Sequence, residues 1–142
     1  MTNGINSYTT ISSLSEYEDR LNLSHNKLFL KSLIKSEDNN LIINSTSLAN
    51  KYYDYILKSV VTVTLKNNEY MKYRYQPKLF CNDMYGTTEL WSLLLKVNNF
   101  NSVSEFNTKK IKAFDTNIFK ILNEILINEN DNINENNENI GL

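Results

Sequence analysis

The chain has 142 residues, 41% of them hydrophobic, which suffices for one modest domain with its own core. Its formal net charge of -1 argues against a basic surface for nucleic acid or an anionic membrane, and no apolar run approaches the ~20 residues that cross a bilayer. One Cys and one His exclude an internal disulfide, a Cys-built metal site and a multi-histidine metal site.

The N-terminal third lacks the turn chemistry of a compact unit. Residues 1–13 are rich in Ser, Thr and Asn without periodicity, which predicts an extended arm that is ordered only if something holds it. Helical spacing follows over residues 15–35, with a break at 22–26, and a polar loop over 36–40. Because these helices carry apolar residues that need cover, we expect residues 1–35 to wrap onto partner chains. The polar, uncharged start shows no secretory signal pattern, so we expect no export through a secretion channel.

A helix is predicted from a cap at Ser45 or Thr46 to about Ser59. Tyr52 and Tyr55 fall on one side of it and are candidate core or interface residues.

Two strand candidates come next. Residues 60–65 are a β-branched run, and residues 69–75 alternate tyrosine and methionine with charged residues in part. With Asn67-Asn68 as a tight turn, they predict a β-hairpin. Tyr73 and Arg74 in the second run are candidate interface anchors, because Tyr and Arg are enriched among them.

The stretch 77–99 predicts two helices around a sharp turn. Pro77 favours a first helical turn, and Tyr85-Gly86 ends that helix, because glycine readily adopts the positive φ of a helix end. A threonine after the glycine caps the second helix, which is apolar on nearly every side and stops at Asn98. Such a helix must be covered on most of its surface. Its candidate core residues are Leu90, Trp91 and Leu94.

The C-terminal part predicts a strand, a helix and a tail. Residues 109–114 are a short strand candidate, and Asp115 or Thr116 caps a strongly amphipathic helix. Ile118 and Leu122 are candidate core residues on its apolar face. From residue 128 the chain is almost entirely Asn, Glu and Asp, which predicts a flexible, disordered tail.

No combination of residues predicts catalysis. Asp83 has no second titratable group at a useful spacing, and we expect an exposed helix carboxylate. Cys81 is expected to be a small buried thiol, and His25 a surface or capping residue. We therefore predict a protein that is not an enzyme, with no catalytic, cofactor-binding or metal-binding residues and no small-molecule substrate.

Residues 69–114 show the order strand, helix, helix, strand and resemble a LysM-type unit. The residues that carry this resemblance are Tyr85-Gly86, Leu90-Trp91, the apolar helix to Val97, and Asn98. Modules of this kind recur in phage tail proteins, where they need not bind peptidoglycan. The glycines and prolines that usually precede the last strand of a peptidoglycan-binding LysM are absent.

A longer pattern, over about residues 46–127, resembles the LysM-containing baseplate wedge subunit of T4-type phages. Lys51-Tyr-Tyr-Asp-Tyr-Ile56, two strand runs, Asp83-Met-Tyr-Gly86, Leu90-Trp-Ser-Leu-Leu-Leu95, Asn98 and the helix from Asp115 stand in the order typical of that family. The insertion that better-known members carry after the Asn is reduced to a few residues here.

The resemblance implies an α+β fold with three parts. These are an N-terminal arm with helices that contact partners (1–45), a β-α-α-β LysM-like core with flanking helices (46–127), and a flexible acidic tail (128–142). It also implies a structural protein of the virion, made in the host cytoplasm, that joins baseplate wedges into a ring around the hub. Its expected partners are other wedge and hub proteins, with copies of itself left open, and neither nucleic acid nor a membrane.

Two alternatives remain open. In the first, the chain is a binding module whose LysM-like unit recognises peptidoglycan in a groove between loops 75–78 and 98–104. In the second, it is another virion connector, such as a neck or tail-completion protein.

Overall fold

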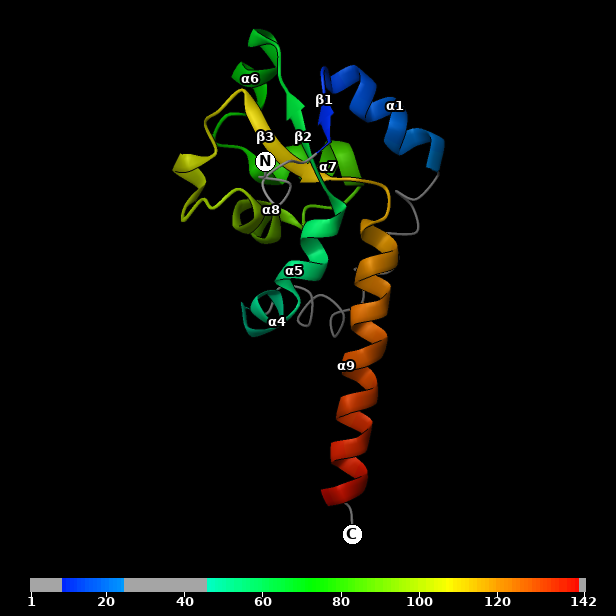
Figure 1. The fold of residues 1–142 in the computed structure, drawn as a ribbon. Helices are drawn as coiled ribbons and strands as arrows, with labels where there is room; N and C mark the ends of the chain where they lie inside the picture. Colours follow the sequence, from blue (N-terminus) through cyan, green and yellow to red (C-terminus); the bar gives the residue numbers. More distant parts are fainter. Residues whose placement is uncertain (1–8, 25–45, 141–142) are drawn as a thin grey trace, which may run out of the picture.

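The structure is a computed structural model that describes residues 9–24 and 46–140, with side chains described over 9–21 and 47–131. Figure 1 shows a small sheet with helices packed against it and one long helix, α9, that leads away from it. The chain is therefore a mixed helix and sheet protein, in agreement with the predicted α+β class.

The sheet has three strands in the order β1-β2-β3. β2 (Val60–Thr64) lies at its centre, antiparallel to β3 (Lys110–Phe114) and parallel to β1 (Thr10–Ile11). Val63 pairs with Ile111 and is completely buried, while its neighbour Thr62 is half-buried. This alternation gives the sheet one apolar face toward the core and one polar face.

The predicted strand over 69–75 is wrong, and with it the hairpin and the first strand of the predicted β-α-α-β unit. Helix α6 (Asn67–Tyr73) occupies this position. The Glu69 carboxylate accepts a hydrogen bond from the Lys66 backbone N–H at 2.7 Å, a capping interaction that favours a helix start. Met71, Tyr73 and Tyr75 alternate as in a strand, but Tyr70 and Tyr73 also have the i, i+3 spacing of one helix face. The partner of β2 is β3 instead.

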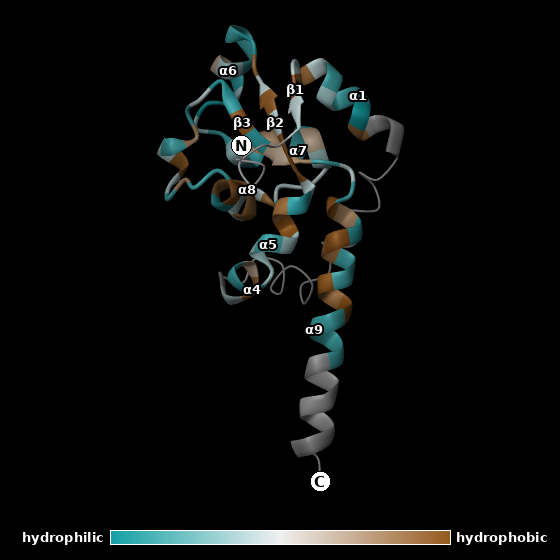
Figure 2. Ribbon diagram, in the orientation of Figure 1, coloured by the Kyte–Doolittle hydropathy of each residue, from teal (hydrophilic) through white to brown (hydrophobic). Residues whose placement is uncertain are grey.

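The central helix pair agrees with the prediction. Helix α7 (Pro77–Tyr85) has Pro in its first turn and ends at Gly86, whose φ of 76° lies in the left-handed region. Helix α8 (Trp91–Val97) follows, and Asn98 comes directly after it. Figure 2 shows α8 as a largely hydrophobic segment. The predicted threonine cap is wrong, because the N-cap residue is Leu90 and makes no side-chain cap bond.

The predicted helix before β2 is present but interrupted. It consists of α4 (Thr46–Lys51), α5 (Tyr53–Ile56) and the 3₁₀ turn η2 (Leu57–Ser59). A second 3₁₀ turn, η3 (Val103–Glu105), lies in the connection between α8 and β3.

The described part of the predicted arm belongs to the fold. Thr10 and Ile11 form β1, and helix α1 (Leu14–Ser24) follows. Ile11, Leu14 and Tyr17 are buried in the core of the same chain. The described part of the arm is thus extended and held in place, as β1, by pairing with β2 of its own chain. Residues 1–8 and 25–45 lie outside the described residues, and with them the predicted surface or capping role of His25.

Helix α9 (Ile118–Ile140) is longer than predicted. Its apolar side chains pack into the core as expected, namely Ile118, Ile121, Leu122, Ile125 and Leu126. The backbone then continues as a helix into the segment expected to be a flexible tail, so that prediction is wrong as far as Ile140. An amphipathic start supplies the helix nucleus, and each further residue adds a hydrogen bond without a new nucleation cost.

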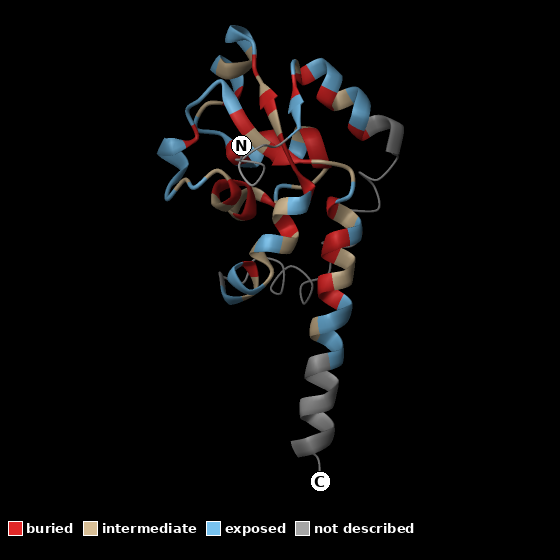
Figure 3. Cartoon of the chain, in the orientation of Figure 1, coloured by how far each residue is buried: buried red, intermediate tan, exposed pale blue. Residues whose placement is uncertain are grey.

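Buried residues form one core between the sheet and the helices, as Figure 3 shows. Phe80 lies at its centre, in ring contact with Tyr17, Tyr73, Tyr85 and Phe106. Within the described residues, no helix combines the length and apolar character of a membrane span.

Candidate functional site

The sequence-predicted candidate residues do not gather in one place. Tyr73, Tyr85, Leu90, Leu94, Ile118 and Leu122 are buried in the core, and Tyr52, Tyr55, Arg74, Gly86, Trp91 and Asn98 are half-buried. Tyr85 and Asn98 belong to a hydrogen-bonded strand edge, and Trp91 lines a groove on the other side of α8.

β3 is an edge strand whose outward-facing backbone groups have side-chain partners. In its antiparallel register with β2, Lys112 and Phe114 direct their N–H and C=O groups away from β2. Asn98 Nδ2 donates to the Lys112 carbonyl at 2.8 Å, and Asn98 Oδ1 accepts from the Lys112 N–H at 2.7 Å. Asn98 thereby pairs with β3 as a neighbouring strand would, which removes an exposed edge.

Two buried tyrosines do the same at Phe114. The Phe114 N–H donates to Tyr85 Oη at 2.9 Å, and Tyr17 Oη donates to the Phe114 carbonyl at 2.5 Å. The hydroxyl oxygens of Tyr17 and Tyr85 lie 2.6 Å apart. Because Tyr17 uses its only proton on the carbonyl, Tyr85 donates to Tyr17, and the three groups form a cyclic network. We call Lys112 and Phe114 with these partners the closed edge of β3.

The closed edge serves structure rather than proton transfer. Burial raises the pKa of both phenols, and the neighbouring hydroxyl adds to the increase at Tyr17. Both groups are therefore neutral at physiological pH and act as hydrogen-bonding groups. Tyr17 is absent from the sequence-predicted candidates, since its partners lie 68 and 97 positions away along the chain.

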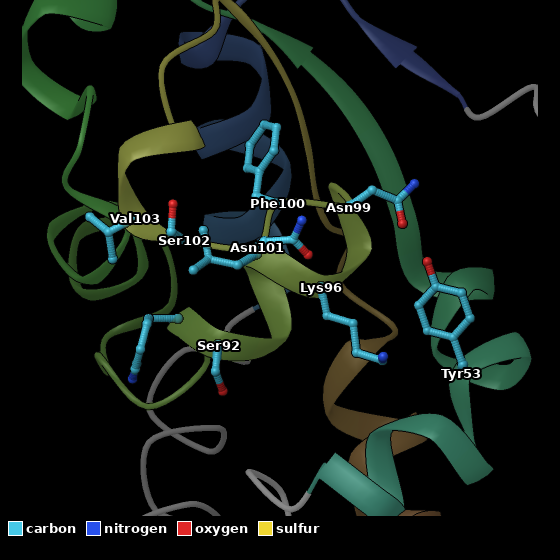
Figure 4. A pocket seen from close by; sticks show the side chains of 10 residues that line it. Tyr53, Ser92, Lys96, Asn99, Phe100, Asn101, Ser102 and Val103 are labelled. Carbon is cyan, nitrogen blue, oxygen red and sulfur yellow. The ribbon is translucent and has the colours of Figure 1, made fainter.

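On its other side, α8 borders a groove of about 790 Å³. We define this α8 groove by the α8 residues between Trp91 and Lys96 that line it, the loop 99–103 and Tyr53. Figure 4 shows Lys96 beside Tyr53 at one end and Ser102 and Val103 at the other. The groove is open to solvent, and its wall combines aromatic rings with amide and hydroxyl groups, a lining suited to binding.

Two lysines lie over aromatic rings at this groove. Lys96 Nζ is 5.3 Å from the centre of the Tyr53 ring, and Lys78 Nζ is 5.0 Å from the centre of the Trp91 ring. Both distances lie within the range of cation–π attraction. The prediction that Trp91 is a core residue is only partly right, because Trp91 is half-buried and packs against the core, whereas Leu90 and Leu94 are completely buried.

The loop wall of the groove has a defined conformation. The Glu105 carboxylate accepts a hydrogen bond from the Ser102 N–H at 3.0 Å and another from the Asn101 N–H. The Phe100 ring packs edge-on against the buried Phe106, with 6.3 Å between ring centres. These contacts hold the loop in one shape, so the groove is formed before a partner arrives.

The remaining chemistry candidates are occupied by structural contacts. Asp83 is half-buried rather than exposed, and its carboxylate accepts from Tyr73 Oη at 2.8 Å and lies 3.4 Å from Lys72 Nζ. Cys81 is buried as predicted, and burial raises the pKa of its thiol. Among the residues described in the structure, no group of three or more His, Cys, Asp or Glu side chains is placed to hold a metal ion.

Sequence reasoning anticipated the loop 99–103 at a groove but missed Tyr53 and Lys96. Tyr53 belongs to α5, and it meets the α8 side of the groove only in the folded chain. Comparison with known proteins found no matching family model, no matching curated protein and no matching solved structure.

Proposed function

We propose that this chain is a structural subunit of a contractile phage tail baseplate, where it joins wedge proteins into a ring around the hub. Its location would be the virion, after synthesis in the host cytoplasm. Other wedge and hub proteins would be its partners, and further copies of the chain are included among them.

The observation that carries the proposal is the role of the residues that gave the resemblance. Tyr85 and Asn98 hydrogen-bond the closed edge of β3, and Gly86 supplies the left-handed end of α7. These three residues of the pattern thus support the backbone of the fold rather than a reaction. Such a pattern suits a protein whose function is to present surfaces to neighbours.

The LysM-like unit takes a modified form in this proposal. Its two strands would be β2 and β3, its two helices α7 and α8, and α6 would be an addition between the first strand and α7. The antiparallel pairing of β2 with β3 supports this assignment.

Two surfaces are available for neighbours. The α8 groove offers half-buried aromatic rings beside lysines, and aromatic residues are enriched at protein interfaces. Helix α9 leads away from the sheet, as Figure 1 shows, and extends the reach of the chain.

Cross-linking mass spectrometry on intact particles of the source virus tests the proposal. We expect the chain in the particles, with cross-links from Lys51, Lys109, Lys27 and Lys31 to other baseplate chains. Cross-links confined to neck proteins would favour a different connector, and absence of the chain from particles would refute a structural role.

A second candidate function is peptidoglycan binding, favoured by the position of Trp91 at an open groove. The groove differs from the one expected, since loop 99–103 lines it but the residues 75–78 do not. Pull-down on purified cell wall separates the two functions. A wedge subunit stays in solution, whereas a glycan-binding module sediments and loses this ability on Trp91→Ala substitution.

A further inference from the structure

The α8 groove has a cationic character that points to an anionic occupant. Among its lining residues, Lys96 is the charged side chain, and Lys78 lies over the Trp91 ring at its border. The nearby Glu105 carboxylate is engaged by two backbone N–H groups of the loop. A carboxylate-bearing peptide would therefore meet ammonium groups, aromatic rings and neutral amides.

The chain itself contains a peptide of this chemistry. Residues 128–142 include four acidic residues, Glu129, Asp131, Glu135 and Glu138, and no basic residue. Glu129 is bonded to Lys51 of the same chain at 3.1 Å, and Asp131, the next acidic residue, is exposed.

Geometry separates this segment from the groove of its own chain. Leu126 is the last core residue of α9, and the helix continues to Ile140. Fourteen further residues at 1.5 Å each extend about 20 Å beyond the core. Figure 1 shows this end leading away from α8. Filling its own groove would require the chain to break α9, whereas the groove of a second copy requires no such change.

We infer that the α8 groove binds the acidic segment 128–142 of a second copy of this chain. The inference rests on the proposed function, of which it specifies one partner. The contact joins two different surfaces, so its repetition builds a ring or an open chain rather than a closed dimer. Exposed ion pairs contribute little individually, which makes a single contact weak and sensitive to salt.

Trp91, the only tryptophan of the chain, reports directly on the groove. The full chain is titrated with a synthetic peptide of residues 128–142 while Trp91 fluorescence is recorded. We expect a saturable change that weakens as salt is added. A matched peptide with Asn or Gln in place of each Asp and Glu should bind at least about fivefold more weakly.

Charge reversal in the full chain tests whether the peptide binds at the α8 groove. Lys96→Glu should weaken peptide binding at least about fivefold. Lys120→Glu, the same change at an exposed position of α9, should leave it unaltered. Circular dichroism verifies that both variants are folded. In sedimentation experiments at rising protein concentration, the parent chain should associate, and Asp131→Asn with Glu135→Gln and Glu138→Gln should reduce association.

A peptide that leaves Trp91 fluorescence unchanged, or equal binding by the acidic and neutral peptides, would overturn the inference. A response to chitin oligosaccharides without one to the peptide would assign the groove to a glycan instead. These failures are distinct from failure of the proposed function, which depends on whether the chain is cross-linked to baseplate proteins in particles.

Discussion

The two sides of α8 use polar and aromatic side chains in opposite ways. Asn98, at its C-terminal end, makes hydrogen bonds to the Lys112 N–H and C=O and to the Leu94 carbonyl. On the other side, Lys96 lies over the Tyr53 ring, and Trp91 is half-buried at an open groove.

The difference shows how one short helix serves both stability and recognition. At the closed edge of β3, side chains hydrogen-bond backbone groups that would otherwise lose their partners on burial, and such pairing is costly to remove. At the groove, side chains contact one another near solvent, where their interactions are weak within the chain and remain available to a partner. Substitutions on the two sides should therefore separate stability from binding.

The largest effect is expected from the core that both sides share. Leu94 is completely buried, so Leu94→Ala should lower the free energy of unfolding by about 2–5 kcal/mol through lost burial and a residual cavity. Urea denaturation followed by circular dichroism measures this loss. Leu79→Ala at a 36% exposed position of α7 is the control and should cost under about 1 kcal/mol. Equal losses would contradict the described packing.

Tyr85→Phe tests the buried part of the closed edge. It removes the acceptor of the Phe114 N–H and the donor to Tyr17, and should cost about 1–3 kcal/mol of unfolding free energy. Tyr70→Phe removes an exposed hydroxyl bonded to Asn107 and should cost under about 0.5 kcal/mol. If the two variants unfold at the same urea concentration, the cyclic network contributes nothing to stability.

Asn98→Ala tests the half-buried part of the same edge. Two backbone groups of Lys112 lose their partner, which should cost about 1–2 kcal/mol in urea denaturation. Faster hydrogen exchange at the Lys112 amide should accompany the loss. Asn101→Ala in the exposed loop is the control, and protection of Lys112 that survives Asn98→Ala would refute the proposed edge pairing.

A smaller effect is expected from the ion pair between α1 and the end of β3. Burial raises the pKa of the Asp115 carboxyl, but two bonds from Arg20, each 2.6 Å long, and the Thr116 N–H hold it below its ordinary value. A carboxyl with a lowered folded-state pKa stabilises the fold above its unfolded pKa of about 3.9. This stability is lost as the pH falls through the folded pKa.

Since Arg20 is half-exposed, we expect the ion pair to contribute only about 0.5–1 kcal/mol. Urea denaturation at pH 7 and at pH 3 measures it. Arg20→Gln should lower the free energy of unfolding at pH 7 and reduce its change between pH 7 and pH 3. If that change stays the same, the pH dependence of stability comes from other carboxyl groups.

The smallest effect on stability is expected in the groove. Lys96→Gln should change the free energy of unfolding by less than about 0.5 kcal/mol, because it removes only a solvent-accessible contact with Tyr53. A loss above 1 kcal/mol would show that the groove side of α8 also supports the fold.

Local sequence determined the elements whose signals lie close together along the chain. Helix α7 begins at Pro77 and ends at Gly86, and the β-branched run forms β2. The i, i+3, i+4 spacing from Ile118 places one face of α9 in the core. In each case the structure is decided by residues that are near neighbours along the chain, within a single helix or strand.

Tertiary structure decided what depends on distant partners. Residues 69–75 suited a helix and a strand alike, and the pairing of β2 with β3 left them free to form α6. Tyr17 reaches Phe114 across 97 positions, and Tyr53 meets Lys96 only because the chain folds α5 beside α8. Backbone hydrogen bonds and ring contacts of this kind leave no periodic trace in a sequence, because their spacing is set by the fold.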